Sequence, residues 1–116
     1  MKITLNGGAP PAEQIRDQLR GLIASGQLAA EQRLPSVRQL AADLGVAPGT
    51  VAKAYRALES DGLLVTRVGA GTRVAATAEA TPRAVLDAAR ALREAGAEHR
   101  LDLEDAIRVV RAVWHE

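Results

Sequence analysis

Residues 44–64 read LGVAPGTVAKAYRALESDGLL, and this stretch decides the fold. A Gly and a Pro stand near its start, and apolar residues then return at the three- and four-residue spacing of one helix face. Those residues are Val51, Ala54, Tyr55 and Leu58. The spacing predicts a helix that begins at Pro48, where a missing N–H costs nothing. The helix runs to about Ser60 and closes at Asp61-Gly62.

A shorter helix precedes this one. Ser36 can cap its N-terminus, with Gln39 three residues later in the position of a capping box. Its apolar face consists of Val37, Leu40, Ala41 and Leu44. Only residues 45–47 separate the two helices, and helices joined by a short turn containing Gly are typical of a helix-turn-helix. In that motif the second helix enters the major groove of DNA, and residues at its N-terminal end meet base edges.

Two β-rich runs follow the helix-turn-helix directly. They cover residues 63–68 and 72–75 and flank Gly69-Ala70-Gly71, which predicts a hairpin whose glycines supply positive φ. Upstream, a periodic apolar pattern predicts a first helix over residues 11–25, after a short run at residues 2–5 that could form a strand. The fold class that we expect is therefore mainly α with a small β-wing, a winged helix-turn-helix.

The residues after Ala75 predict a separate segment. Residues 76–82 read as a linker, and two short helices follow, the first of them closing at Gly96. Two helices this short bury little by themselves. We expect a winged helix-turn-helix DNA-binding domain over residues 1–75 and a C-terminal helical dimerisation segment over residues 76–116. The apolar stripes of the two C-terminal helices are most simply part of a core or of a dimer interface. The candidate interface residues are Leu86, Leu92, Leu103, Ile107, Val110 and Trp114.

The composition argues against several functional classes. The chain has no Cys and only two His, far apart in sequence, so we expect no metal site. No convergent set of acid, base and nucleophile and no nucleotide-binding glycine motif is visible, so we expect neither an enzyme nor a cofactor. No segment has the apolar length of a signal peptide or a membrane span, and we expect a cytoplasmic protein without a membrane partner.

The charge is unevenly distributed. The net charge is only +1, but residues 1–75 carry nine Lys or Arg against six Asp or Glu, whereas residues 76–116 carry six against eight. A mildly basic half that meets DNA would give this pattern, and so would ordinary scatter. The charge therefore leaves the two interpretations open, and the motifs must decide between them.

Residues 9–75 contain an ordered series of short motifs. They are Gln14-Ile15, Leu34-Pro35-Ser36 with Arg38, Leu40-Ala41, Leu44-Gly45-Val46, Thr50-Val51, Ala54-Tyr55, Leu58-Glu59, Asp61-Gly62-Leu63, and Gly69, Gly71 and Thr72. In this order and spacing they resemble the DNA-binding domain of GntR-type bacterial transcription regulators. The run TVAKAYRALESDGL is similar to the small YtrA-type subfamily. In that subfamily a short helical appendage makes a dimer, and the resemblance implies the same for the residues after Ala75.

Candidate DNA contacts come from both helices of the motif and from the hairpin. The resemblance implies that Arg38 binds a guanine or a phosphate; the alternatives are a solvated side chain or an ion pair with Asp43 or Glu59. The start of the second helix favours a phosphate because free N–H groups and the helix dipole point there. The full set is Ser36, Arg38, Pro48, Gly49, Thr50, Lys53, Tyr55, Arg67, Gly69, Gly71 and Arg73.

Other members of this set also have a structural alternative. Gly49 can be part of the turn, and Thr50 can be a secondary cap. Ser36 is first a helix cap, and Tyr55 is a core residue or a phosphate contact. Side chains alternate between the two faces of a hairpin, so not every residue around Arg67 and Arg73 can face DNA.

These observations lead us to expect a sequence-specific DNA-binding transcriptional regulator. The simplest form is a homodimeric repressor on an inverted-repeat operator, with double-stranded DNA and a second copy as its partners. The sequence leaves open whether a small-molecule effector binds. The alternative is a protein-interaction module or antirepressor that has lost sequence-specific DNA binding. Family members usually carry polar or basic residues where this chain has Ala47-Pro48-Gly49 and Ala70, and these neutral positions keep the alternative in play.

Overall fold

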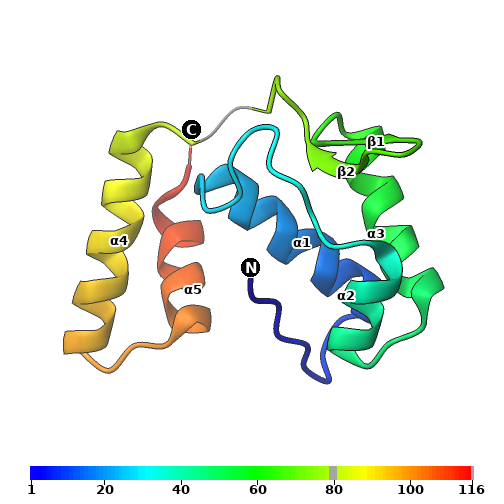
Figure 1. Ribbon diagram of the computed structural model, residues 1–116. Coiled ribbons are helices and arrows are strands. Elements are labelled where there is room, and N and C mark those ends of the chain that lie inside the picture. Colours follow the sequence, from blue (N-terminus) through cyan, green and yellow to red (C-terminus); the bar gives the residue numbers. More distant parts are fainter. Residues whose placement is uncertain (79–80, 116) are drawn as a thin grey trace. The chain divides into compact units, whose positions relative to one another are not determined.

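The computed structural model describes residues 1–78 and 81–115, and in them the chain folds as a winged helix-turn-helix followed by a pair of helices (Figure 1). The elements are α1 (Pro11–Ala24), α2 (Val37–Leu44), α3 (Pro48–Ser60), β1 (Leu64–Arg67), β2 (Gly71–Val74), α4 (Arg83–Glu98) and α5 (Leu103–Val113). The expected fold class is confirmed. None of the helices in the described part is long and apolar enough to cross a membrane.

The chain divides into two compact units, Met1–Ala80 and Thr81–Glu116. The functional division that we expect, residues 1–75 and 76–116, stays a prediction. Part of the expected linker, residues 79 and 80, lies outside the described residues, as does residue 116.

The helix-turn-helix forms for the local reasons that the sequence suggests. The Ser36 hydroxyl accepts a hydrogen bond from the Gln39 backbone N–H at 3.1 Å and caps α2. Gly45 ends α2 at φ 68°, a left-handed conformation that glycine adopts without steric cost. Pro48 begins α3, and the residue before it, Ala47, provides no side-chain cap.

α3 is the central element of the first unit, because α1, α2 and β1 all pack against it. The core is aliphatic apart from one tyrosine, and fully burying one Leu or Ile contributes about 1.5–3 kcal/mol. An ion pair between Arg20 of α1 and Asp61 also joins α1 to the end of α3. The buried side chains are Ile15, Leu19, Ile23, Leu28, Leu34, Leu40, Ala41, Val51, Ala54, Tyr55, Leu58, Leu64 and Val74.

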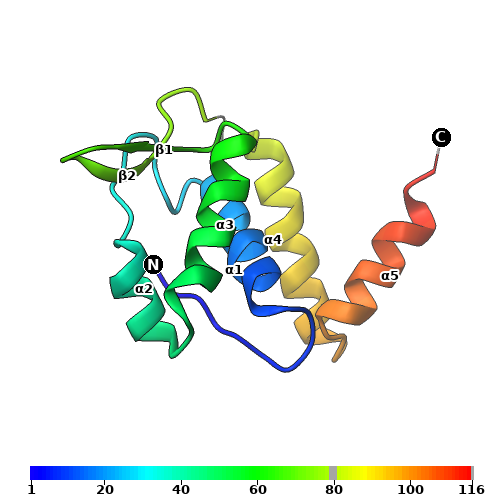
Figure 2. The same cartoon turned by 90° about the vertical axis from the view of Figure 1, so that its right-hand side faces the viewer.

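The wing is an antiparallel hairpin that gains a third strand-like edge. β1 and β2 pair with Val65 opposite Arg73 and Arg67 opposite Gly71. On the other side of β2, Arg33 bridges to Arg73, and the Leu34 N–H donates to the Thr72 carbonyl at 2.8 Å. The segment before α2 therefore extends the sheet, and it runs from the edge of β2 to the N-terminal end of α2 (Figure 2).

The N-terminal segment pairs with a helix, and residues 2–5, which by sequence could form a short strand, do not form one. The Thr4 N–H donates to Gln18 Oε1 at 2.9 Å, and Gln18 Nε2 donates to the Thr4 carbonyl at 2.7 Å. Asn6 and Gln14 exchange the same two bonds, each at 2.9 Å. The segment is thus held by glutamine side chains of α1, and its apolar side chains pack on the core.

The second unit is a helical hairpin, and its turn differs from the prediction. We expect the first helix to close at Gly96, but α4 continues through Gly96 to Glu98. The Leu101 N–H returns to the Gly96 carbonyl at 2.8 Å, and Arg100 takes the left-handed conformation at φ 59°. The left-handed residue that ends the helix is therefore Arg100, and Gly96 lies inside α4 with its carbonyl accepting the returning bond.

Candidate nucleic-acid interface

The N-terminal end of α3 is exposed and lacks a side-chain cap. Pro48, Gly49 and Lys53 are exposed, whereas Thr50 is half-buried. The residue at the cap position, Ala47, has no side-chain acceptor. The free backbone N–H groups of the first turn of α3 therefore receive no side-chain cap. These N–H groups and the positive end of the helix dipole favour an anion. No atom lies within 4 Å of a Cβ built on Gly49, so the backbone there is open to close approach.

Arg38 projects from α2 into solvent, and the intradomain ion pair that we considered for it does not form. Asp43 accepts a hydrogen bond from Gln39 Nε2 at 2.8 Å. Glu59 accepts one from the Thr66 hydroxyl at 2.9 Å. In the ranges 1–78 and 81–115 no carboxylate pairs with Arg38. Its guanidinium is available to an external partner. Ser36, the cap of α2, is exposed beside it.

Tyr55 requires a correction, because the structure places it in the core rather than at the surface. Only 2% of the residue is exposed, and its hydroxyl donates to the Pro35 carbonyl at 2.7 Å. Burial raises the pKa of the Tyr55 phenol from 10.0 to about 12, because the charged phenolate loses its hydration. The hydroxyl ties α3 to the segment before α2. We therefore remove Tyr55 from the proposed DNA contacts.

The two arginines of the hairpin lie on one face, although alternation could have separated them. The register places Arg73 opposite Val65, two residues from Arg67, so all three point to the same side. Leu64, Thr72 and Val74 fill the opposite side, which is buried. Gly69 and Gly71 have φ of 81° and 71° and form the tight turn. The outer face of the wing is therefore cationic.

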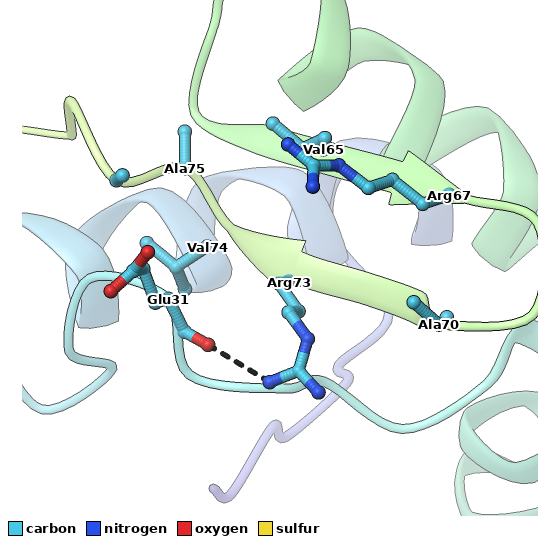
Figure 3. A pocket seen from close by; sticks show the side chains of 9 residues that line it. Glu31, Val65, Arg67, Ala70, Arg73, Val74 and Ala75 are labelled. Carbon is cyan, nitrogen blue, oxygen red and sulfur yellow. Dashed lines mark hydrogen bonds between the residues drawn. The ribbon is translucent and has the colours of Figure 1, made fainter.

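An open groove of about 410 Å³ follows this outer face (Figure 3). Arg67 and Arg73 line it together with Glu31 and Val65. Arg73 Nη1 donates to the Glu31 carbonyl at 3.2 Å, while the Glu31 carboxylate points away from that guanidinium (Figure 3). The groove combines two cations with a small apolar floor.

Sequence reasoning missed two residues of the wing. Val68 at the tip is 107% exposed, and Arg33 lies on the third edge of the sheet against Gly71. The signal for Val68 was its place before the hairpin glycines. Arg33 lies in the run before Ser36, for which we predict no definite helix or strand, so no pattern points its side chain to the wing.

The C-terminal hairpin leaves its apolar stripes largely uncovered. Of the candidate interface residues, Leu92, Leu103 and Trp114 are exposed, and Leu86, Ile107 and Val110 are half-buried. α5 has no buried residue and α4 only Gly96. Further apolar residues that we did not select are exposed on the same unit, namely Val85, Leu101, Val109 and Val113.

In the described residues of the whole chain, no group of three or more His, Cys, Asp or Glu could hold a metal ion.

Together these features define a winged helix-turn-helix protein with an exposed recognition-helix terminus. The chain belongs to the bacterial regulatory proteins of the gntR family, whose family model matches residues 11–74. It is 37% identical over 81 residues to the HTH-type transcriptional repressor YtrA of Bacillus subtilis (strain 168), covering 70% of this chain and 62% of that protein. The chain likewise spans 60% of the transcriptional regulator Rv1152 of Mycobacterium tuberculosis, so it matches less than two thirds of either relative.

Two groups of solved structures are similar. YtrA from Sulfolobus acidocaldarius, a GntR-family transcription factor, matches with a TM-score of 0.58 and 38% identity, covering 79% of this chain and 96% of that one. AraR(DBD) in complex with operator ORX1 matches with a TM-score of 0.58 and 29% identity, covering 65% of this chain and 96% of that one. The relatives are regulators of transcription rather than enzymes.

Proposed function

We propose that this protein is a sequence-specific DNA-binding regulator of transcription. The observation that carries the proposal is the uncapped, exposed N-terminal end of α3, with Lys53 on α3 and Arg38 on α2 both exposed. The likeness to AraR(DBD), which was solved with an operator, supports the same conclusion. Arg38 and Lys53 would bind guanine or phosphate, and the backbone at Gly49 would approach a phosphate.

The form that we propose is a homodimer that represses by occupying an inverted-repeat operator. Exposed Leu103 and Trp114 on a hairpin with little buried surface support a second copy as the partner of the C-terminal unit. A two-fold dimer presents two equal recognition helices, which read half-sites about one helical turn apart. The YtrA relative is a repressor, which favours that sign of regulation. With DNA as its target, the protein would act in the cytoplasm.

A second candidate function has one observation in its favour. The residue before α3 and its first two positions are Ala47, Pro48 and Gly49, which carry no side-chain donors, and the turn of the wing contains Val68 and Ala70. A neutral, partly apolar surface of this kind suits contact with a protein. In that case the chain would act as an interaction module or antirepressor without reading DNA sequence.

Selection of bound fragments from genomic DNA tests the proposal, followed by affinity measurements across salt concentrations. A regulator should enrich an inverted repeat and bind it with a steep salt dependence, because each phosphate contact releases counterions. Binding that is weak and indifferent to sequence would reject the regulator and favour the protein-contact function.

A further inference from the structure

A third arginine joins the two of the hairpin on the outer face of the wing. Arg33 forms an antiparallel bridge with Arg73, and cross-strand partners point to the same side of a sheet. Arg67 lies on that side as well, because the register pairs it with Gly71. All three arginines are exposed. The surface therefore gathers three guanidinium groups from three separate segments of the sheet.

Gly71 makes room for the Arg33 side chain. A Cβ built on Gly71 would lie 3.2 Å from both Nε and Nη2 of Arg33, closer than ordinary van der Waals contact. Gly69 also has a positive φ, of 81°, but no atom lies within 4 Å of its Cβ position. Gly71 therefore has a role that Gly69 lacks, which is to let the guanidinium of Arg33 rest against the backbone of the turn.

These positive charges have no carboxylate partner among the residues that the structure describes. No ion pair there involves Arg33, Arg67 or Arg73. Arg73 donates to a backbone carbonyl, that of Glu31. Like charges held close together repel one another, and a bound anion relieves that repulsion. The outer face of the wing is therefore suited to an anionic partner.

We propose that Arg33, seated against Gly71, binds a backbone phosphate of DNA beside the wing, with Arg67 on the same surface. This inference rests on the proposed function. It favours DNA over another anion because the segment that carries Arg33 leads within three residues to Ser36, at the N-terminal end of α2. The segment that carries Arg33 thus leads from the edge of the wing to α2, the helix that carries Arg38 (Figure 2).

The test compares Arg33→Gln with the unmodified protein on two duplexes, the selected operator and a scrambled sequence of equal length. A phosphate contact carries no sequence information, so both duplexes should lose affinity by the same factor. Loss of one contact should flatten the slope of log affinity against log salt by about 0.9, which amounts to about eightfold weaker binding at 0.1 M salt. Arg16→Gln on α1 removes one charge outside the proposed surface and is the matched control.

The salt dependence of Arg33→Gln distinguishes failure of this inference from failure of the proposed function. An unchanged slope in Arg33→Gln, or a change no larger than that in Arg16→Gln, overturns the inference while leaving the proposed function intact. Failure of the unmodified protein to select any sequence rejects the proposed function, and this inference with it. Arg33 is exposed, and thermal unfolding of the variant verifies that it folds.

A second comparison tests the seat at Gly71. Gly71→Ala and Gly69→Ala both place a side chain at positive φ, but only the first displaces Arg33. The effects of Gly71→Ala and Arg33→Gln on affinity should therefore be non-additive, because both act on one guanidinium. Those of Gly69→Ala and Arg33→Gln should add. Additive effects for the Gly71 pair would show that Arg33 binds without support from the turn, and the proposed seat would be wrong.

Discussion

Replacing Tyr55 by Phe should weaken the fold without touching the DNA surface. The hydroxyl donates to the Pro35 carbonyl at 2.7 Å in a nearly dry site, so its removal leaves a buried acceptor without its donor. Such a loss costs about 1–3 kcal/mol. In a domain of 60–100 residues, each kcal/mol lowers the unfolding temperature by roughly 4–8 °C.

The same residue predicts how stability changes in alkali. The pKa of Tyr55 is about 12 in the folded protein, against 10.0 for an exposed phenol. Below pH 10 both states keep the proton, and the full stabilisation is present. As the pH rises from 10 towards 12 the unfolded state releases its proton first, so stability falls. At about 1.36 kcal/mol per pH unit, the loss approaches roughly 2.7 kcal/mol.

Denaturant unfolding of the original and Tyr55→Phe proteins across this pH range isolates the effect, because other groups titrate in both. The difference in unfolding free energy between them should shrink above pH 10. Tyr55 is also the only tyrosine of the chain, so phenolate absorbance reports its ionisation directly. Parallel loss of stability in both proteins, or a phenolate midpoint near 10 in the folded protein, would refute the burial argument. A loss of DNA affinity in folded Tyr55→Phe would restore the phosphate-contact role.

Three further predictions concern the other surfaces. Arg38→Ala should weaken operator binding by roughly 1–3 kcal/mol and relax one base position, and an unaltered affinity in a binding titration would contradict its role. Leu103→Ala with Trp114→Ala should shift sedimentation towards the monomer while the fold persists, because both side chains are exposed. Val68→Ala, which removes an exposed apolar side chain of the wing instead, is the control. Arg100→Gly should raise hairpin stability by about 0.5–1 kcal/mol in thermal unfolding, since Arg100 has φ 59°; a decrease would mean that its side chain matters more than its backbone.

The winged helix-turn-helix was predictable because each of its elements has a local signal. Ser36 caps α2, Gly45 ends it and Pro48 begins α3, as the sequence indicates. The end of α4 was not predictable in this way. Gly96 looks like a helix terminator, but α4 continues to Glu98 and ends where the Leu101 N–H returns to the Gly96 carbonyl. Sequence spacing contains no information about that contact.

The residues of the candidate site divide in the same way, into those with a local sequence signal and those placed by contacts between distant segments. Exposed Arg38 and Lys53 could be found from helical periodicity alone. The placement of Arg33 depends on pairing between distant segments, which bring it to Gly71, and Tyr55 could have been a core residue or a surface contact by spacing alone. Only the hydrogen bond to Pro35 and the packing around the ring distinguish the two.

The pairing of the N-terminal segment with α1 shows that a helix can substitute for a neighbouring strand. Gln14 and Gln18 are four residues apart, a rise of about 6.0 Å along a helix, whereas Thr4 and Asn6 are two residues apart, about 6.6 Å along an extended chain. The two repeats differ by about 0.6 Å per step, so the match holds for two rungs and drifts with each one added. Glutamine side chains spaced four residues apart on a helix can therefore pair with the backbone of a short extended peptide. The mismatch between the two repeats limits the length of such a pairing.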